Sequence, residues 1–193
     1  MALAQSLLVG LALGFSLTVP PGPMNALIAS VSTRSLRGGI LTGLGAMASD
    51  VVFGGLVFGL ESTVNLRAFV EPIYWIGCVV MLYFAARLLA RRGAPLPPLG
   101  DVETFSRALG TALTNPFQIL WWLTAGVASA YVGGIVLLLG LFGAIAIWVV
   151  AFPFAIRTGT RRIPRMETVV VYVSGAIMLG LAVYFSVLAL RAL

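Results

Sequence analysis

Six long apolar stretches constrain the fold of this chain more than any other feature. They cover residues 2–31, 39–60, 68–90, 105–130, 133–156 and 168–190. A helix needs about 20 residues to cross a bilayer, and lipid offers no partner to backbone groups outside a helix or a closed barrel. Of the 193 residues, 60% are hydrophobic and 9% are charged, whereas soluble domains carry about 25% charged residues. The sequence therefore predicts an all-α polytopic membrane protein with six transmembrane helices.

A proline-rich segment, residues 93–104, separates two halves of three stretches each. We expect a single transmembrane domain made of two repeats, residues 1–92 and 105–193. Because each repeat has an odd number of spans, the second must be inverted relative to the first, as in many secondary transporters. The first stretch has no basic segment before it, so we expect a retained span and not a signal peptide.

Arginines are distributed unevenly between the predicted loops. All twelve basic residues of the chain are arginines. Ten lie in or beside the loops after the first, third and fifth stretches: Arg34, Arg37, Arg87, Arg91, Arg92, Arg107, Arg157, Arg161, Arg162 and Arg165. Only Arg67 and Arg191 lie on the other side. Since cytoplasmic loops carry the excess of basic residues, we expect these three loops to be cytoplasmic and both termini to lie outside.

The first stretch is interrupted near its middle by Pro-Pro-Gly-Pro at positions 20–23. Proline lacks a backbone donor and clashes with the carbonyl one turn earlier, so this break leaves carbonyls unpaired at a depth where lipid cannot bind them. Such a break requires a cavity or a protein partner beside it. Transporters build substrate and ion sites from interrupted helices, so we interpret the break as part of a functional site.

The fourth stretch repeats this pattern. Pro23 with Asn25 in the first stretch, and Pro116 with Gln118 in the fourth, each belong to a Pro-x-amide-x-Leu motif. Proline is favoured at the first position of a helix, which predicts that a new helix begins at each motif. We therefore expect the first and fourth transmembrane helices to be broken at proline. Asn115 is a good N-cap for the second of the new helices.

Two helix N-termini near the bilayer centre would form a site for an anionic group such as a carboxylate, because each carries a partial positive charge. We expect Gly22 and Asn115, together with the prolines that follow them, to line this substrate site. Asn25 and Gln118 would orient the substrate there. Trp121 and Trp122, one turn beyond Gln118, are in position to line the cavity or to stack on a substrate cation, and Trp121 is the one predicted to bind substrate. Packing against lipid or within the bundle is the alternative role of both.

Asp50 is a carboxylate in the middle of the second stretch. At about 1.5 Å per residue it lies about 18 Å from the cytoplasmic boundary, and Pro23 and Gln118 lie at about 16 Å. No arginine falls in the core of a predicted span to pair with it. Ionisable residues at this depth mark ion and proton pathways, so Asp50 is the predicted proton-coupling residue. A contact with the substrate amine, or a purely structural hydrogen bond, is the alternative.

Three short motifs resemble those of a known family. They are Pro21-Gly22-Pro23 in the first stretch, Gly43-x-Gly45 followed by Asp50 in the second, and Asn115-Pro116 in the fourth. In these motifs, and in length and span order, the chain resembles the LysE/RhtB family of amino-acid exporters. The resemblance implies a cytoplasmic-membrane exporter of amino acids or related small zwitterionic solutes, driven by the proton gradient. We include Pro21 with Gly22 and Pro23 among the predicted substrate-binding residues.

Two positions depart from the family pattern. Phe117 stands where members often carry a lysine after the Asn-Pro pair, and Ser49 stands where a glycine usually precedes the aspartate. Both departures lie beside predicted site residues. They bear on which substrate the site accepts.

Other functional classes fit the sequence less well. The chain has one cysteine, Cys78, and no histidine, which argues against thiol–disulfide exchange, Ser-His dyads and histidine metal sites. We expect no enzyme activity, no metal site and no cofactor. Arginines and aromatic residues do not alternate as nucleic-acid binding would require. An inorganic-ion transporter of similar architecture and a non-transporting membrane scaffold are the alternatives.

Small residues recur at a spacing of four within several stretches. The pairs are Gly10 with Gly14, Gly39 with Gly43, Gly55 with Gly59, and Ala176 with Gly180. Such pairs let two helix backbones approach closely. We expect them to pack helices inside one bundle, and they permit a homodimer without requiring one.

Overall fold

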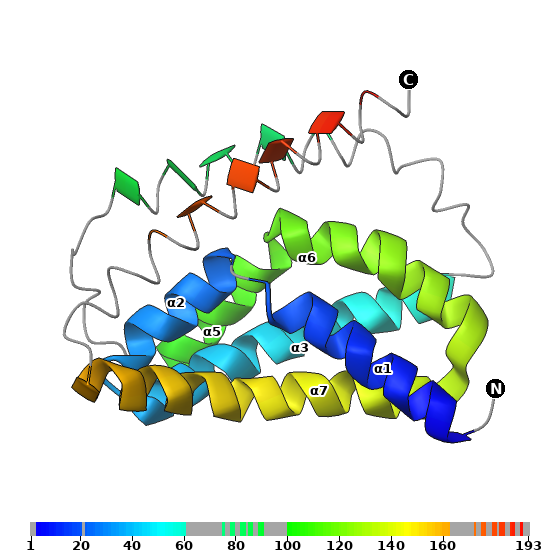
Figure 1. The fold of residues 1–193 in the computed structure, drawn as a ribbon, viewed down its shortest axis with the longest axis horizontal. Coiled ribbons are helices and arrows are strands. Elements are labelled where there is room, and N and C mark those ends of the chain that lie inside the picture. The colour runs from blue at the N-terminus through cyan, green and yellow to red at the C-terminus, as the bar shows by residue number, and fades with distance from the viewer. Residues whose placement is uncertain are drawn as a thin grey trace.

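The structure is a computed structural model that describes residues 3–20, 22–60 and 100–162 continuously, with separate positions between 75 and 90 and between 172 and 190. Its elements with defined bounds are α1 (Leu3–Thr18), α2 (Pro23–Ser32), α3 (Leu36–Leu60), α5 (Asp101–Leu113), α6 (Pro116–Trp121), the π-helix η2 (Trp122–Gly126) and α7 (Val127–Arg162) (Figure 1). No strand occurs among the described residues. The expected all-α fold is confirmed for them.

The first predicted span is broken at its prolines. Helix α1 ends at Thr18, α2 begins at Pro23, and the two helix axes are bent by 78°. Pro23 occupies the start of α2, where its missing N–H removes no helical hydrogen bond, and Gly22 is extended at the N-cap. The chain therefore turns sharply inside the span and restarts as a helix at the position that the motif predicted.

The fourth predicted span is broken at the matching place. Helix α5 ends at Leu113, and α6 begins at Pro116 directly after its N-cap, Asn115. Helix α6 then continues through η2 into α7, since the residues at both junctions keep helical dihedral angles. The prediction that the first and fourth spans are broken at proline is confirmed.

The linker between the two halves ends earlier than predicted. Helix α5 begins at Asp101, so residues 101–104 are helical, whereas residues 93–99 lie outside the described part of the chain. Asp101 and Glu103 place negative charge in the first turn of α5, where the partial positive charge of the helix N-terminus stabilises it. Residues that their polarity assigned to a loop therefore form the first turn of a helix.

Helices α1 and α7 are packed with very little side chain between their backbones (Figure 1). A Cβ atom on Gly10 would lie 2.1 Å from the carbonyl oxygen of Leu137, and one on Gly14 would lie 2.4 Å from that of Leu141. Gly134, with non-helical dihedral angles, divides α7 into two parts. Later positions in α1 meet later positions in the part of α7 after Gly134, so α1 and this part run parallel. The expectation that Gly10 and Gly14 pack helices inside the bundle is confirmed.

The first and fourth spans run in opposite directions. Ser16 near the end of α1 accepts a hydrogen bond from Trp121 in α6, whereas Met24 in α2 packs against Ala108 in α5. Later positions in the first span therefore meet earlier positions in the fourth. This is the relation that an inverted repeat requires.

Only part of the predicted span arrangement is described. The third and sixth predicted spans, residues 68–90 and 168–190, lie mostly outside the described residues. The antiparallel first and fourth spans agree with two inverted repeats. The complete six-span repeat stays a prediction.

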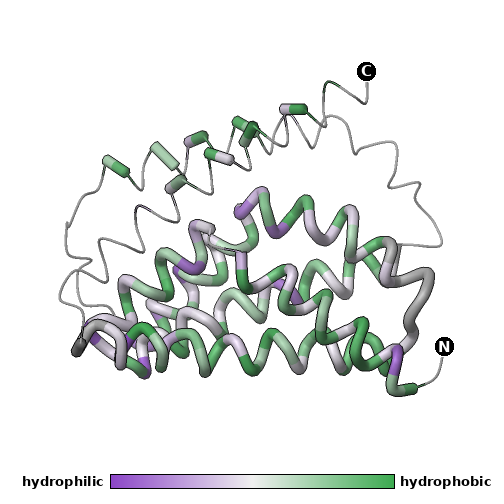
Figure 2. Tube along the Cα trace, in the orientation of Figure 1, coloured by the Kyte–Doolittle hydropathy of each residue, from purple (hydrophilic) through white to green (hydrophobic). Residues whose placement is uncertain are grey.

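In the described part of the chain, two helices are long and apolar enough to cross a membrane, over Leu36–Gly59 in α3 and Gly134–Gly159 in α7, and the bent pair α1 and α2 qualifies as a broken span. Apolar residues predominate along these helices (Figure 2), and large side chains such as Leu56 and Phe154 are exposed on them. Exposed apolar side chains on spanning helices are compatible with lipid around them. The chain is a multi-pass membrane protein.

One end of the bundle gathers segments that carry arginine. Arg37 at the start of α3 forms an ion pair of 2.5 Å with Asp101 at the start of α5. Arg157 near the end of α7 donates a hydrogen bond to the backbone carbonyl of Thr33, just after α2. Three segments that the arginine distribution placed on one side of the membrane therefore lie together in space.

Candidate functional site

A cavity of about 50 Å³ lies beside both helix breaks. Residues of α1, α2, α3, α6 and α7 and of the two breaks line it. Its polar side chains are Thr18, Asn25, Asp50, Asn115, Gln118 and Trp148. The cavity therefore brings the predicted break residues and the predicted proton-coupling residue to one place.

Asn25 closes the gap that the first break leaves in the helical hydrogen bonds. Its Nδ2 donates to the carbonyl oxygens of Thr18 at 2.6 Å and Pro20 at 3.0 Å. Its Oδ1 accepts a hydrogen bond of 3.1 Å from the indole N–H of Trp148 in α7. Thr18 and Pro20 would otherwise have no helical donor, because the chain turns away at Pro20. Asn25 thus holds both halves of the broken span and ties them to α7.

Asn115 has a different task at the second break. Its Oδ1 accepts from the backbone N–H of Phe117 at 3.2 Å, which caps the N-terminus of α6. The side chain is only 3% exposed. Its Nδ2 has no hydrogen-bond partner among the described residues, and Asn115 is one of the residues that line the cavity. Asn115 therefore has an unused donor beside the cavity.

Asp50 lies in the interior of the bundle and is 3% exposed. Its Oδ1 accepts from Nε2 of Gln118 at 2.5 Å and from the indole N–H of Trp122 at 2.9 Å. The same Gln118 nitrogen lies 2.7 Å from Oγ of Ser49. The described residues place no arginine within ion-pair distance of Asp50. Neutral N–H donors, and not a cation, hold this carboxylate.

Two acceptor oxygens beside Asp50 and Gln118 receive no hydrogen bond from the described residues. Neither Oδ2 of Asp50 nor Oε1 of Gln118 has a hydrogen-bond donor among the described residues, and both side chains line the cavity. Buried polar atoms in folded proteins normally have a partner, from the protein or from water. These two oxygens are therefore suited to a bound solute that carries N–H groups.

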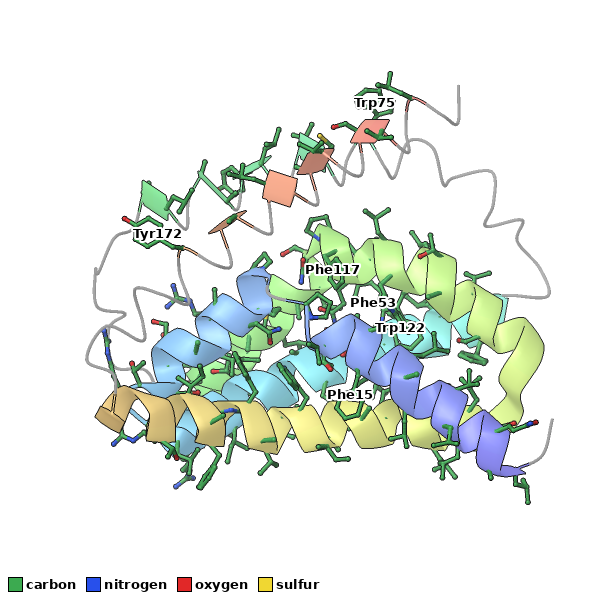
Figure 3. All side chains as sticks on the ribbon, in the orientation of Figure 1. Phe15, Phe53, Trp75, Phe117, Trp122 and Tyr172 are labelled. Atoms are coloured by element: carbon green, nitrogen blue, oxygen red, sulfur yellow. The ribbon has the colours of Figure 1, made fainter. Side chains whose placement is uncertain are left out.

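The two neighbouring tryptophans have different roles. Trp122 follows Gln118 by four residues, lies on the same helix face, and donates to the same carboxylate oxygen. Trp121 instead donates to Oγ of Ser16 in α1 at 3.1 Å and does not line the cavity. Figure 3 shows the Trp122 side chain in the middle of the bundle, near Phe53 and Phe117, with which it shares an apolar cluster.

The structure thus brings together most of the residues that the sequence singled out. Gly22, Asn25, Asp50, Asn115 and Gln118 line the cavity. Pro23 and Pro116 set the starts of α2 and α6 from buried positions beside it. Pro21 lies outside the described residues, and Trp121 contacts Ser16 instead of the cavity.

Trp148 and the contact between Trp122 and Asp50 were missed by sequence reasoning. The spacing of four between Gln118 and Trp122 was a usable signal, since it places both side chains on one helix face. Trp148 had no such signal, because it lies 123 positions from Asn25 in sequence. Among the described residues, no group of three or more histidine, cysteine or acidic side chains is arranged to hold a metal ion.

Comparison with known families decides the class of protein. The model of the family described as LysE type translocator matches residues 15–188, which is most of the chain. The chain belongs to this family. As a LysE type translocator it is a membrane transporter, and the cavity at the two breaks is its candidate substrate site. Comparisons with curated proteins and with solved structures give no significant match.

Proposed function

We propose that this LysE type translocator exports amino acids or related small zwitterionic solutes across the cytoplasmic membrane, in exchange for protons. The observation that carries the proposal is a cavity with unpaired donors at the helix breaks and unpaired acceptors at Asp50 and Gln118. A zwitterion needs both kinds of group a short distance apart. Proline breaks in two antiparallel spans allow donors and acceptors to lie around one cavity.

The carboxylate of the substrate would bind at the first break. Gly22 has no side chain to cap α2, so the first N–H groups of α2 and its partial positive charge remain open to an anion. Nδ2 of Asn115 adds a donor from the opposite break. The N-terminus of α6 contributes less than expected, because Asn115 already occupies the N–H of Phe117.

The ammonium group would bind at the other side of the cavity. Oδ2 of Asp50 and Oε1 of Gln118 are its acceptors, and Asp50 supplies the negative charge. Among the described residues that line the cavity, Asp50 is the only charged one. A bound zwitterion would therefore complete hydrogen bonds that the protein leaves unmade.

The same carboxylate supports exchange with protons. A proton on Asp50 removes the charge that holds the ammonium group, so proton and substrate compete for one site. Binding of one requires release of the other, which couples their movements in opposite directions. The sequence leaves two roles open for Asp50, proton carrier and ligand of the substrate amine. In this mechanism Asp50 has both roles.

The described cavity has room for a few waters, which is less than an amino acid needs. Substrate entry therefore requires the lining helices to separate. Helices α1 and α7 are joined through Gly10 and Gly14 and form one candidate rigid unit, and α3 with α5 forms another, joined through Gly45. We propose that rocking between these units opens the cavity to one side and then to the other.

Efflux from proteoliposomes tests the function. Vesicles loaded with an isotopically labelled amino-acid mixture should release one or more components, and release should accelerate when the outer solution is acidified to impose a proton gradient. Asp50→Asn should abolish the acceleration. Asp101→Asn, which removes an exposed acid outside the cavity, should retain it.

Two results would contradict the proposal. Gradient-driven efflux that is unchanged in Asp50→Asn would remove the proton-coupling role. No release of any amino acid by the wild-type protein, together with no thermal stabilisation by any of them, would favour a non-transporting scaffold.

A further inference from the structure

Much of the cavity lining is apolar, and five of its side chains make up what we call the apolar wall. Leu17 from α1, Ile28 from α2, Met47 from α3, and Ile145 and Val149 from α7 form it. Four of the five are buried, and Met47 is partly buried. Four helices thus place aliphatic and thioether side chains in the same cavity as the polar side chains.

Among the described lining residues, the groups left without a hydrogen-bond partner serve one ammonium and one carboxylate. Oδ1 of Asp50 already accepts hydrogen bonds from Gln118 and Trp122. Both ends of the Asn25 amide are engaged, by the carbonyls of Thr18 and Pro20 and by Trp148. A second cation on the substrate would meet no second carboxylate in the lining.

We infer that the apolar wall is a side-chain subsite that selects amino acids with uncharged, aliphatic or thioether side chains; this inference rests on the proposed function. An apolar side chain gains by leaving water for this wall. A cationic side chain loses its hydration there without a compensating partner. Met47, with a flexible and polarisable side chain, lets the subsite fit side chains of different shape.

Norleucine and ornithine are matched probes for this subsite. Their side chains have the same number of non-hydrogen atoms, and they differ in a terminal methyl group against a terminal ammonium group. Proteoliposomes are loaded with both, within a panel that also contains leucine, methionine, serine, glutamine and lysine, and each efflux rate is measured by mass spectrometry. We expect norleucine to leave at least about tenfold faster than ornithine, and the fastest solute of the panel to have an apolar side chain.

The outcomes separate this inference from the proposed function. Equal rates for norleucine and ornithine, faster ornithine, or a charged or polar amino acid as the fastest solute would overturn the subsite but keep the exporter. Efflux of no amino acid at all would overturn both.

Met47→Glu tests the wall itself. The new carboxylate stands one helical turn from Asp50, so the two ammonium groups of ornithine would meet two acidic side chains. The ratio of ornithine to norleucine efflux should rise about tenfold or more over the wild type. Met47→Gln, similar in size but uncharged, should leave that ratio within about threefold of the wild type. An equal rise of this ratio in both variants would show that polarity, not charge, sets the selection, and would overturn the inference. If Met47→Glu does not fold, the comparison of norleucine with ornithine efflux in the wild type decides.

Discussion

Asp50 is buried without a cation partner among the described residues. Its neighbours stabilise it there by hydrogen bonds. An amide N–H from Gln118 and an indole N–H from Trp122 both point at Oδ1. Hydrogen bonds to a charged group are stronger than those between neutral groups, yet these donors add no positive charge. The carboxylate therefore keeps its capacity to attract a cation or a proton on the other oxygen.

Trp122→Phe tests this arrangement at the residue scale. The change removes the indole N–H from Asp50 but keeps an aromatic ring in the apolar cluster. A hydrogen bond to a charged group contributes about 1.5–3 kcal/mol, so we expect a loss of stability of this order and a clear reduction in the initial rate of gradient-driven efflux. Thermal unfolding in detergent and vesicle efflux measure the two effects.

Trp121→Phe is the matched control, because Trp121 donates to Ser16 and not to Asp50. It should reduce stability by about 1 kcal/mol, as loss of a neutral hydrogen bond does, and should leave the response to a proton gradient intact. If both variants reduce gradient-driven efflux equally, the contact between Trp122 and Asp50 has no special part in transport.

At the scale of elements, the two helix breaks look alike in sequence but are stabilised in different ways. Asn25 donates back to the carbonyls of the helix that has ended, whereas Asn115 accepts from the helix that begins. The first break therefore depends on a side chain for its unpaired carbonyls. The second is an ordinary N-cap that continues into a long helix.

Substitution of the two asparagines should expose this difference. Asn25→Ala leaves the carbonyls of Thr18 and Pro20 without their donor and the N–H of Trp148 without its acceptor, which we expect to destabilise the protein by about 2–4 kcal/mol. Asn115→Ala removes one N-cap and should cost about 1 kcal/mol. Denaturant unfolding in detergent compares them. A larger loss for Asn115→Ala would contradict the role assigned to Asn25.

At the scale of the whole molecule, the arginine-bearing segments around Arg37 and Arg157 lie at one end of the bundle. The first and fifth predicted spans run parallel, and the first and fourth run antiparallel. These relations agree with six spans that alternate in direction. The distribution of arginines then favours both termini outside.

Labelling of single cysteines tests this orientation. In a Cys78→Ala background, Leu3→Cys and Ile135→Cys should react with a membrane-impermeant maleimide in intact cells, because both exposed positions lie at the predicted outer side. Ser35→Cys, next to the arginines that follow the first span, should react only after the membrane is permeabilised. The reverse pattern would invert the topology.

Much of the site was predictable, because its signals are local in the chain. Proline at positions 23 and 116 fixes where a helix restarts, since the ring lacks an N–H and presets the backbone angle. Asn115 before Pro116 is an N-cap pattern that can be recognised without tertiary structure. Asp50 stood out because a carboxylate is rare in an apolar stretch.

Contacts between distant helices were not predictable in the same way. Sequence alone does not show that Trp122 donates to Asp50 and Trp121 to Ser16, because η2 and the packing of α6 decide where each indole points. The bond from Trp148 to Asn25 depends on the rotation of α7 against α2. Neither is encoded in a short motif.

The sequence by itself determined the helical membrane fold and the positions of both breaks, because hydropathy and proline act on the segment that contains them. Only the tertiary structure decided which groups face the cavity and which of their hydrogen bonds remain unmade. The apolar wall of Met47, Ile145 and Val149 belongs to the second kind. Each of these side chains is ordinary in an apolar helix, and only packing places them in one cavity with a carboxylate.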